Sequence, residues 1–289
     1  MNATVVANHS RRNAPANATA LAALNAKAVA NSNPSRRNAS LPTLFCFLVA
    51  STFHQEEIDL VRYQWLVKKG IFACEAARAY GDQRLPLQPG SDDTPYIIPH
   101  YMRPSSVATA GWLANLEVFM KVWGMVVAEG VYKSHSVTVK TDPDAVYLPW
   151  RLRHKIAHID PEKPWYIHNC MPGKMQGPLE VLSRAAVELY TNVSFRDRTC
   201  SEKMTWQFQI QEFGAAPGED MFLDHCLGWM GVEPVLDIHT LADQNCMWNA
   251  SEGCGGQGYD HKAHRPAYHW FKSVPAWKKC LQEAIEADQ

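Results

Sequence analysis

The stretch Val137-Thr-Val-Lys-Thr-Asp-Pro-Asp-Ala-Val-Tyr-Leu148 places two carboxylates at the end of an apolar, β-branched run. The run predicts a buried strand that ends near Asp142. Side chains two positions apart in an extended chain point to one side, so Asp142 and Asp144 are expected to face the same cleft. Pro143 between them prevents further strand pairing. Converging carboxylate oxygens suit Mn²⁺ or Mg²⁺, which commonly carry substrate phosphates, so the stretch predicts a metal-diphosphate site.

A purely structural alternative is a Thr-Asp-Pro-Asp turn whose carboxylates cap backbone N–H groups. The apolar strand before the motif and the Ala-Val-Tyr-Leu-Pro run after it favour the metal site, because a solvent-exposed turn rarely lies between two such segments.

The composition divides the chain into two parts. Residues 1–41 form an Asn/Ala-rich tail that we expect to be disordered, since its first forty residues contain eight Asn, five Arg or Lys and no acid. Residues 42–289 have a globular composition and a length that suits one α/β domain. With a formal net charge of -1, the chain shows no electrostatic signature of a nucleic-acid partner.

The cysteines and glycosylation sequons indicate the compartment. Eight cysteines without any C-x-x-C pair favour disulfides, and six Asn-x-Ser/Thr sequons, including those at Asn192 and Asn249, point the same way. Together they favour the lumen of the secretory pathway, with an organelle-targeted or cytoplasmic location as alternatives. The apolar run at 44–50 is too short to span a bilayer, and we expect a buried first strand there rather than a signal segment. A membrane-tethered form would need an anchor that this chain does not contain.

The remaining patterns predict alternating strands and helices. The spacing of apolar residues, Leu66 among them, predicts a helix over 55–70 before a short strand at 71–74, which completes a βαβ unit, and residues 81–106 are expected to form a long loop. Further helices are expected over 109–128, 184–190 and 219–231, and a further strand at 165–168. The 177–183 segment leads into the 184–190 helix, with Ser183 as the helix N-cap, and Gly231 is the expected stop of the 219–231 helix.

Other polar residues are candidates for chemistry. Asp220, which opens a predicted helix beside Glu219, is the candidate general base, and Glu219 would orient it or bind acceptor hydroxyls, although capping alone explains acids at that position. His269 is a candidate third metal ligand, and Lys272 is a cation that can reach a diphosphate.

Two further sets of residues concern zinc binding and sugar binding. The spacing of Cys246, Cys254, His261 and His264 lacks the paired short gaps of a zinc site. Any of four tryptophans could offer a flat apolar face to a sugar, although most are expected in the core: Trp150, Trp165, Trp206 and Trp229.

The order of these segments over Pro42 to Cys280 resembles the GT-A glycosyltransferases, nearest to the inverting β-1,3-glycosyltransferase and fringe-like group. The resemblance lies in the first strand, the Lys-Thr-Asp-Pro-Asp motif, the 177–183 segment, the Gly218-Glu-Asp-Met-Phe-Leu-Asp-His-Cys-Leu227 helix start and His269-Trp-Phe-Lys272. It implies a mostly parallel, Rossmann-like sheet flanked by helices in a single catalytic domain.

The resemblance also implies roles for the candidate residues. Asp144 would bind Mn²⁺ (or Mg²⁺) directly, Asp142 would assist through the metal or the ribose, and His269 would complete the coordination. Asp220 would deprotonate the acceptor, and the 177–183 segment would line the acceptor side. The donor substrate would be a nucleotide-sugar, with a UDP-sugar as the first choice, and the acceptor would be a hydroxyl of a glycan or glycoprotein. The Golgi lumen is the location that this family implies.

The sequence departs from the family pattern at Pro143, between the two acids, and at Met221, where a valine is common. Neither change removes a ligand. Two other classes of function are compatible with the motifs: a haloacid-dehalogenase-like phosphatase with Asp142 as nucleophile and Asp144 as acid/base, and a non-catalytic carbohydrate-binding homologue.

Overall fold

The computed structural model describes residues 40–51, 53–82, 87, 96–97, 115–170, 173–196, 200, 218–246, 254 and 264–289. Residues from Leu41 to Gln289 form one compact unit. The predictions for the tail, for the sequon at Asn249, for Trp206 and His261, and for most of the 81–106 loop fall outside the described residues. No helix in the described ranges is long and apolar enough to cross a bilayer.

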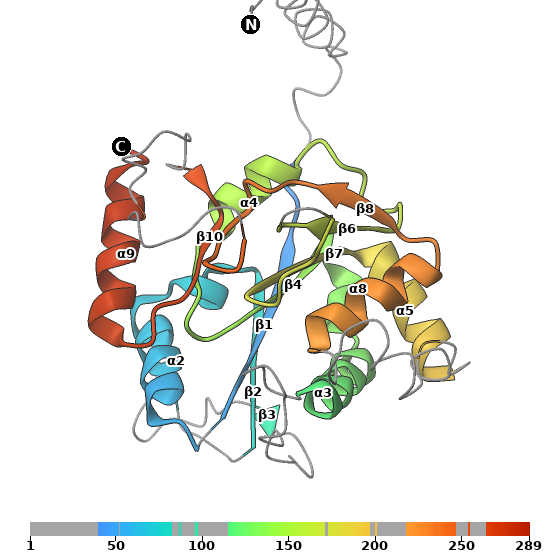
Figure 1. The fold of residues 1–289 in the computed structure, drawn as a ribbon, viewed down its shortest axis with the longest axis horizontal. Coiled ribbons are helices and arrows are strands. Elements are labelled where there is room, and N and C mark those ends of the chain that lie inside the picture. The colour runs from blue at the N-terminus through green and yellow to red at the C-terminus, as the bar shows by residue number, and fades with distance from the viewer. Residues whose placement is uncertain are drawn as a thin grey trace, which may run out of the picture. The chain divides into compact units, whose positions relative to one another are not determined.

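The central sheet has seven strands in the order β3-β2-β1-β4-β7-β6-β8 (Figure 1). Of the described strands in this sheet, only β7 runs antiparallel to its neighbours. The strands are β1 (Leu44–Ala50), β2 (Ala76–Gly81), β3 (Tyr96–Ile97), β4 (Val137–Thr141), β6 (Trp165–His168), β7 (Leu179–Ser183) and β8 (Glu233–Leu236). The predicted α/β class with a mostly parallel sheet is confirmed.

Helices cover both faces of the sheet, which explains why every residue of β4, and every residue of β1 except Val49, is buried. One face packs against α3 (Leu116–Glu129), α5 (Arg184–Arg196) and α8 (Glu219–Trp229). The other packs against α2 (Gln55–Val67), the 3₁₀ turn η2 (Gly70–Ala73) and α4 (Pro149–Ile156). A second 3₁₀ turn, η3 (Val131–Ser134), follows α3, and the C-terminal helix α9 (Val274–Glu286) packs beside α2.

A small second sheet, in the order β5-β10-β9, lies next to α9. Its strands are β5 (Val146–Tyr147), β10 (Ala267–Tyr268) and β9 (Leu241–Ala242). Trp277 of α9 fills the core between this sheet and α2, and its indole N–H donates to the carbonyl of Ala145 over 2.9 Å. Each strand has two residues, so we infer that packing rather than strand propensity holds this sheet together.

Three details of the sequence-based fold were wrong. The apolar residues 71–74 are not a strand: Gly70–Ala73 form η2, and β2 begins at Ala76. Ile71 is buried against the sheet and does not pair within it. Tyr96–Ile97 form β3 within the expected loop, and Leu66, assigned to the apolar face of its helix, is 75% exposed.

Four disulfides join all eight cysteines: Cys46–Cys74, Cys170–Cys246, Cys200–Cys226 and Cys254–Cys280. Disulfides were predicted, and their presence is confirmed. Cys246 and Cys254 are thereby removed as thiolate ligands for zinc. Disulfides of this number are consistent with a lumenal or secreted protein.

Candidate metal and transfer site

Three strand ends of the second sheet bring polar residues to one point. Asp144 lies two residues before β5, Asp243 follows β9 and His269 follows β10. Tyr268 is in register with both Val146 and Ala242, so the residues beyond these strand ends become neighbours. Backbone hydrogen bonds fix the arrangement: His269 N–H donates to the Ala242 carbonyl over 2.8 Å, and Phe271 N–H to the Asp144 carbonyl over 2.9 Å.

Asp142, Asp144 and His269 form a group that could hold a metal ion, because one ligand atom from each lies within 4.8 Å of the others. His269 Nε2 is 3.4 Å from Asp144 Oδ1. The other ring nitrogen, Nδ1, bonds to the carboxylate of Asp243, which is fully buried. A carboxylate that binds the far nitrogen of a metal-ligating histidine fixes the orientation of the ring.

The pKa values of Asp144 and His269 are shifted in opposite directions by their mutual contact and their other partners. Burial raises the pKa of Asp144, but its bonds to His269 and Lys272 outweigh burial and hold the pKa at about 2. Burial lowers the pKa of His269, but its bonds to Asp144 and Asp243 raise it to about 9. Two cationic groups therefore stabilise the Asp144 carboxylate, and a divalent cation would replace them as its partner.

Asp220 lies at the start of α8, where its carboxylate accepts two backbone N–H groups. Gly177 N–H donates to Oδ2 over 3.0 Å and Met221 N–H to Oδ1 over 2.8 Å. Burial, followed by the like charge of Glu219, raises the pKa of Asp220 to about 6 despite these bonds. A carboxylate with this pKa is a better proton acceptor near neutral pH than an ordinary aspartate.

Beneath these acids lies Lys140 of β4, whose side chain is 2% exposed. Its ammonium contacts Asp142 Oδ1 at 2.9 Å, Glu219 Oε1 at 3.0 Å and the Gly177 carbonyl at 2.9 Å, and Glu180 Oε1 lies at 3.4 Å. Burial lowers the pKa of Lys140, but these carboxylates raise it well above its ordinary value, so the ammonium stays charged.

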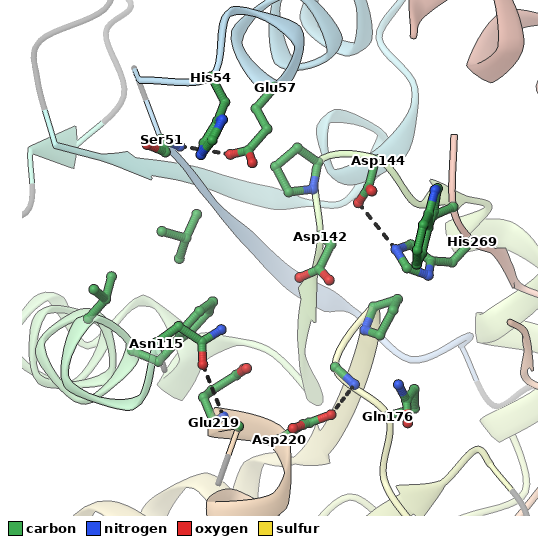
Figure 2. A pocket seen from close by; sticks show the side chains of 18 of the residues that line it. Ser51, His54, Glu57, Asn115, Asp142, Asp144, Gln176, Glu219, Asp220 and His269 are labelled. Carbon is green, nitrogen blue, oxygen red and sulfur yellow. Dashed lines mark hydrogen bonds and ion pairs between the residues drawn. The ribbon is translucent and has the colours of Figure 1, made fainter. Parts of the chain in front are cut away.

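One open pocket of about 370 Å³ has a volume that suits a small-molecule ligand (Figure 2). The residues described above that line it are Asp142, Asp144, Gly177, Glu219, Asp220, His269 and Lys272. Ser51, His54 and Glu57 border the pocket where β1 leads into α2, and Asn115 borders it before α3. Trp270, 47% exposed, and Lys272, with a 63% exposed side chain, lie on the pocket wall beside His269.

The structure brings the sequence-predicted site residues into this one pocket: Asp142, Asp144, Glu219, Asp220, His269 and Lys272. The carboxylate of Glu219, which was predicted to orient Asp220 or to bind acceptor hydroxyls, pairs with Lys140. Trp165 is buried in the core, and neither Trp150 nor Trp229 lines this pocket, which instead includes Phe119 and Trp270.

Sequence reasoning missed Lys140, Glu180 and Asp243. A signal for the first two exists, since each is the charged residue in an otherwise uncharged strand, Val-Thr-Val-Lys-Thr and Leu-Glu-Val-Leu-Ser. A charge in a fully buried strand needs a partner of opposite charge. Asp243 carries no such local signal, since it follows a strand of only two residues.

No protein-family model and no curated protein matches this sequence. Among solved structures, the chain is similar to the crystal structure of a glycosyltransferase involved in the glycosylation of the major capsid of PBCV-1. The TM-score is 0.39 at 11% sequence identity, over 86% of this chain and 99% of that one. A likeness at this level does not distinguish one activity from another within an α/β fold.

Proposed function

We propose that the protein is a metal-dependent inverting glycosyltransferase of the GT-A class, which transfers a sugar from a nucleotide-sugar to a hydroxyl of a glycan or glycoprotein. One observation carries the proposal: the Asp142, Asp144 and His269 group and the Asp220 carboxylate, whose pKa is about 6, face the same pocket from different elements (Figure 2). This arrangement separates the binding of a diphosphate from the removal of an acceptor proton.

The residues take the following roles in this proposal. Asp144 and His269 would hold the cation directly, and Asp142 would support it or the ribose. When bound, the cation would neutralise charge that develops on the leaving diphosphate. Lys272 lies at the pocket wall, where its ammonium pairs with Asp144, and it would add a point charge toward the same oxygens.

Asp220 accepts the proton of the acceptor hydroxyl as its oxygen attacks the anomeric carbon, and the bond to the diphosphate oxygen breaks. The backbone N–H groups of Gly177 and Met221 hold the carboxylate in place. A single displacement assisted by one base inverts the anomeric configuration. The UDP-sugar, the Mn²⁺ and the kinship with the β-1,3 and fringe-like group are proposed from the resemblance of this sequence to that family.

The test is a thermal-unfolding screen with UDP, GDP and CMP, each with and without Mn²⁺, because a ligand that binds the folded state raises its apparent stability. We expect Mn²⁺-dependent stabilisation by UDP in the wild type and its loss in Asp144→Ala. Glu286→Gln, an exposed site on α9, is the matched control. Stabilisation that is unchanged in Asp144→Ala would remove Asp144 from the site.

The same screen separates the alternatives. A phosphatase would respond to beryllofluoride with Mg²⁺ and not to UDP, and a carbohydrate-binding homologue would respond to glycans without a metal-dependent nucleotide effect. Transfer itself is then measured as UDP release from UDP-sugars, with inversion read from the anomeric coupling constant of the product by NMR.

For location, we propose the lumen of the secretory pathway, in particular the Golgi. The four disulfides support an oxidising compartment. Imaging of the tagged full-length protein beside Golgi markers, together with its sensitivity to glycosidases, tests this proposal. A cytosolic signal and an unglycosylated chain would contradict it.

A further inference from the structure

The function proposed above assigns no role to the buried ammonium of Lys140. Lys140 is a buried ammonium with three donors, and three of its contacts are 3.0 Å or shorter: Asp142 Oδ1, Gly177 O and Glu219 Oε1. Each acceptor lies on a different part of the site. Asp142 belongs to the metal-binding group, Gly177 to the segment before β7, and Glu219 to the first turn of α8 beside the proposed base.

These three contacts connect the two halves of the site through one side chain. Gly177 donates its N–H to Asp220 and its carbonyl accepts from Lys140, so this one peptide segment lies between the ammonium and the base. Asn115 holds the other side of the helix start, since its Oδ1 accepts Glu219 N–H over 3.2 Å. We propose that Lys140 is a positioning residue that fixes the metal-binding acids and the base-bearing turn of α8 at the separation that transfer requires.

Glu180 supports this geometry from the neighbouring strand. It is the register partner of Lys140 across β4 and β7 and is fully buried. Burial, followed by the like charge of Glu219, raises the pKa of Glu180 well above its ordinary value. Asp142 and Glu219 make the closer contacts with the ammonium, at 2.9 and 3.0 Å, against 3.4 Å for Glu180.

A simple role in core packing is the alternative, and a charge-free variant distinguishes the two. Lys140→Met keeps most of the side-chain volume and removes the three donors. Because misplacement of reacting groups by about 1 Å costs about 100-fold in rate, we expect kcat to fall by about 10- to 100-fold for each folded molecule. We expect one Mn²⁺ to remain bound per folded molecule, since Asp142, Asp144 and His269 are all retained.

The pH profile gives a second readout. The groups that act on Asp220 are burial and Glu219, which raise its pKa, and Lys140 and the Gly177 and Met221 N–H groups, which lower it. Removal of the ammonium therefore shifts the acid limb of the kcat profile to higher pH. Loss of folded molecules alone would scale activity without moving the limb.

The experiment compares wild type, Lys140→Met and Lys155→Met. Lys155 is a matched control on α4 whose ion pair with Asp237, at 2.8 Å, lies away from the pocket lining. Bound Mn²⁺ is counted by electron paramagnetic resonance, folded protein by circular dichroism, and kcat against pH by UDP release. If Lys140→Met does not fold, Lys140→Met/Glu180→Leu removes the buried charge from both strands and is compared with Glu180→Leu alone.

A lower kcat with full Mn²⁺ stoichiometry and a raised acid limb supports the positioning role. A kcat per folded molecule equal to that of wild type, or an unmoved limb, overturns it. The wild-type protein separates this result from the proposed function on which it rests. If wild type shows neither Mn²⁺-dependent UDP binding nor transfer, the glycosyltransferase proposal fails. If wild type is active and Lys140→Met has the same kcat and the same acid limb, only the positioning role of Lys140 is removed.

Discussion

At the scale of single residues, the site depends on groups that orient other groups. Asp243 is the clearest case, because its carboxylate holds His269 Nδ1 and thereby leaves Nε2 toward Asp144. We expect Asp243→Asn to weaken Mn²⁺ affinity by about 10- to 100-fold, as for other partners of metal-ligating histidines. Calorimetric titration of Mn²⁺ measures the change. Asp237→Asn, which removes a partly exposed ion pair with Lys155, is expected to bind Mn²⁺ like the wild type; equal affinities in both variants would contradict the role of Asp243.

Asp220 sets the pH dependence of the proposed reaction. Because its pKa is raised to about 6, we expect kcat to decline as pH falls below about 6, where the protonated carboxyl cannot accept a proton, and to level off above that value. Asp220→Asn is expected to lower kcat by about 10²- to 10⁴-fold and to abolish this limb. Glu56→Gln, at an exposed acid in the first turn of α2, controls for the charge change. A variant that retains the rate and the limb would show that another group is the base.

At the scale of elements, Ser183 joins a strand end to a helix start. Its Oγ accepts the N–H of Trp165 over 3.0 Å and of Ala186 over 3.1 Å, and its hydroxyl donates to the Lys163 carbonyl over 2.8 Å. Ser183→Ala leaves buried backbone groups unpaired, so we expect a loss of about 1–3 kcal/mol in the free energy of unfolding. Denaturant titration measures it. Ser273, the exposed N-cap of α9, makes no side-chain cap bond, and Ser273→Ala is expected to change stability by less than about 0.5 kcal/mol. Similar losses in both variants would contradict the assignment.

Helix and strand positions were predictable where the local pattern was strong. The apolar run of β1, the buried strand β4, the N-cap at Ser183 and the positive φ of Gly231 after α8 all agree with the sequence. The wrong prediction of a strand at 71–74 shows the limit of local patterns, because an apolar run can pack against the face of a sheet as well as pair within it.

The end of α2 depends on backbone conformation. Lys68, the C-cap residue, is left-handed, and at Gly70, with φ +60°, a Cβ would clash with the side chain of Gln64. Gln64 in turn donates to the Pro143 carbonyl over 2.8 Å and so supports the acidic turn.

At the scale of the whole molecule, the disulfides carry a large share of stability. They close chain separations of 28, 76, 26 and 26 residues. Each such bridge typically contributes about 2–4 kcal/mol, whereas a whole domain is stable by about 5–15 kcal/mol. We therefore expect the fully reduced chain to lose its cooperative thermal transition near the native Tm. Circular dichroism with and without reductant, with alkylation and mass spectrometry to confirm eight free thiols, provides the measurement. An unchanged Tm after complete reduction would contradict this expectation.

The sequence by itself determined the α/β class, the strand that ends in Asp142 and Asp144, and the helix start that carries Asp220, because periodicity, caps and breakers act over a few residues. It also contains a signal for Lys140 and Glu180, because each is the one charged residue of a buried strand and a buried charge needs a partner. Only the tertiary structure decided that Asp243 holds His269, that one ammonium joins β4 to α8, and which cysteines pair. These contacts join residues as far apart as 79 positions, as between Lys140 and Glu219. Such partners are selected by strand order and packing, which no local pattern encodes.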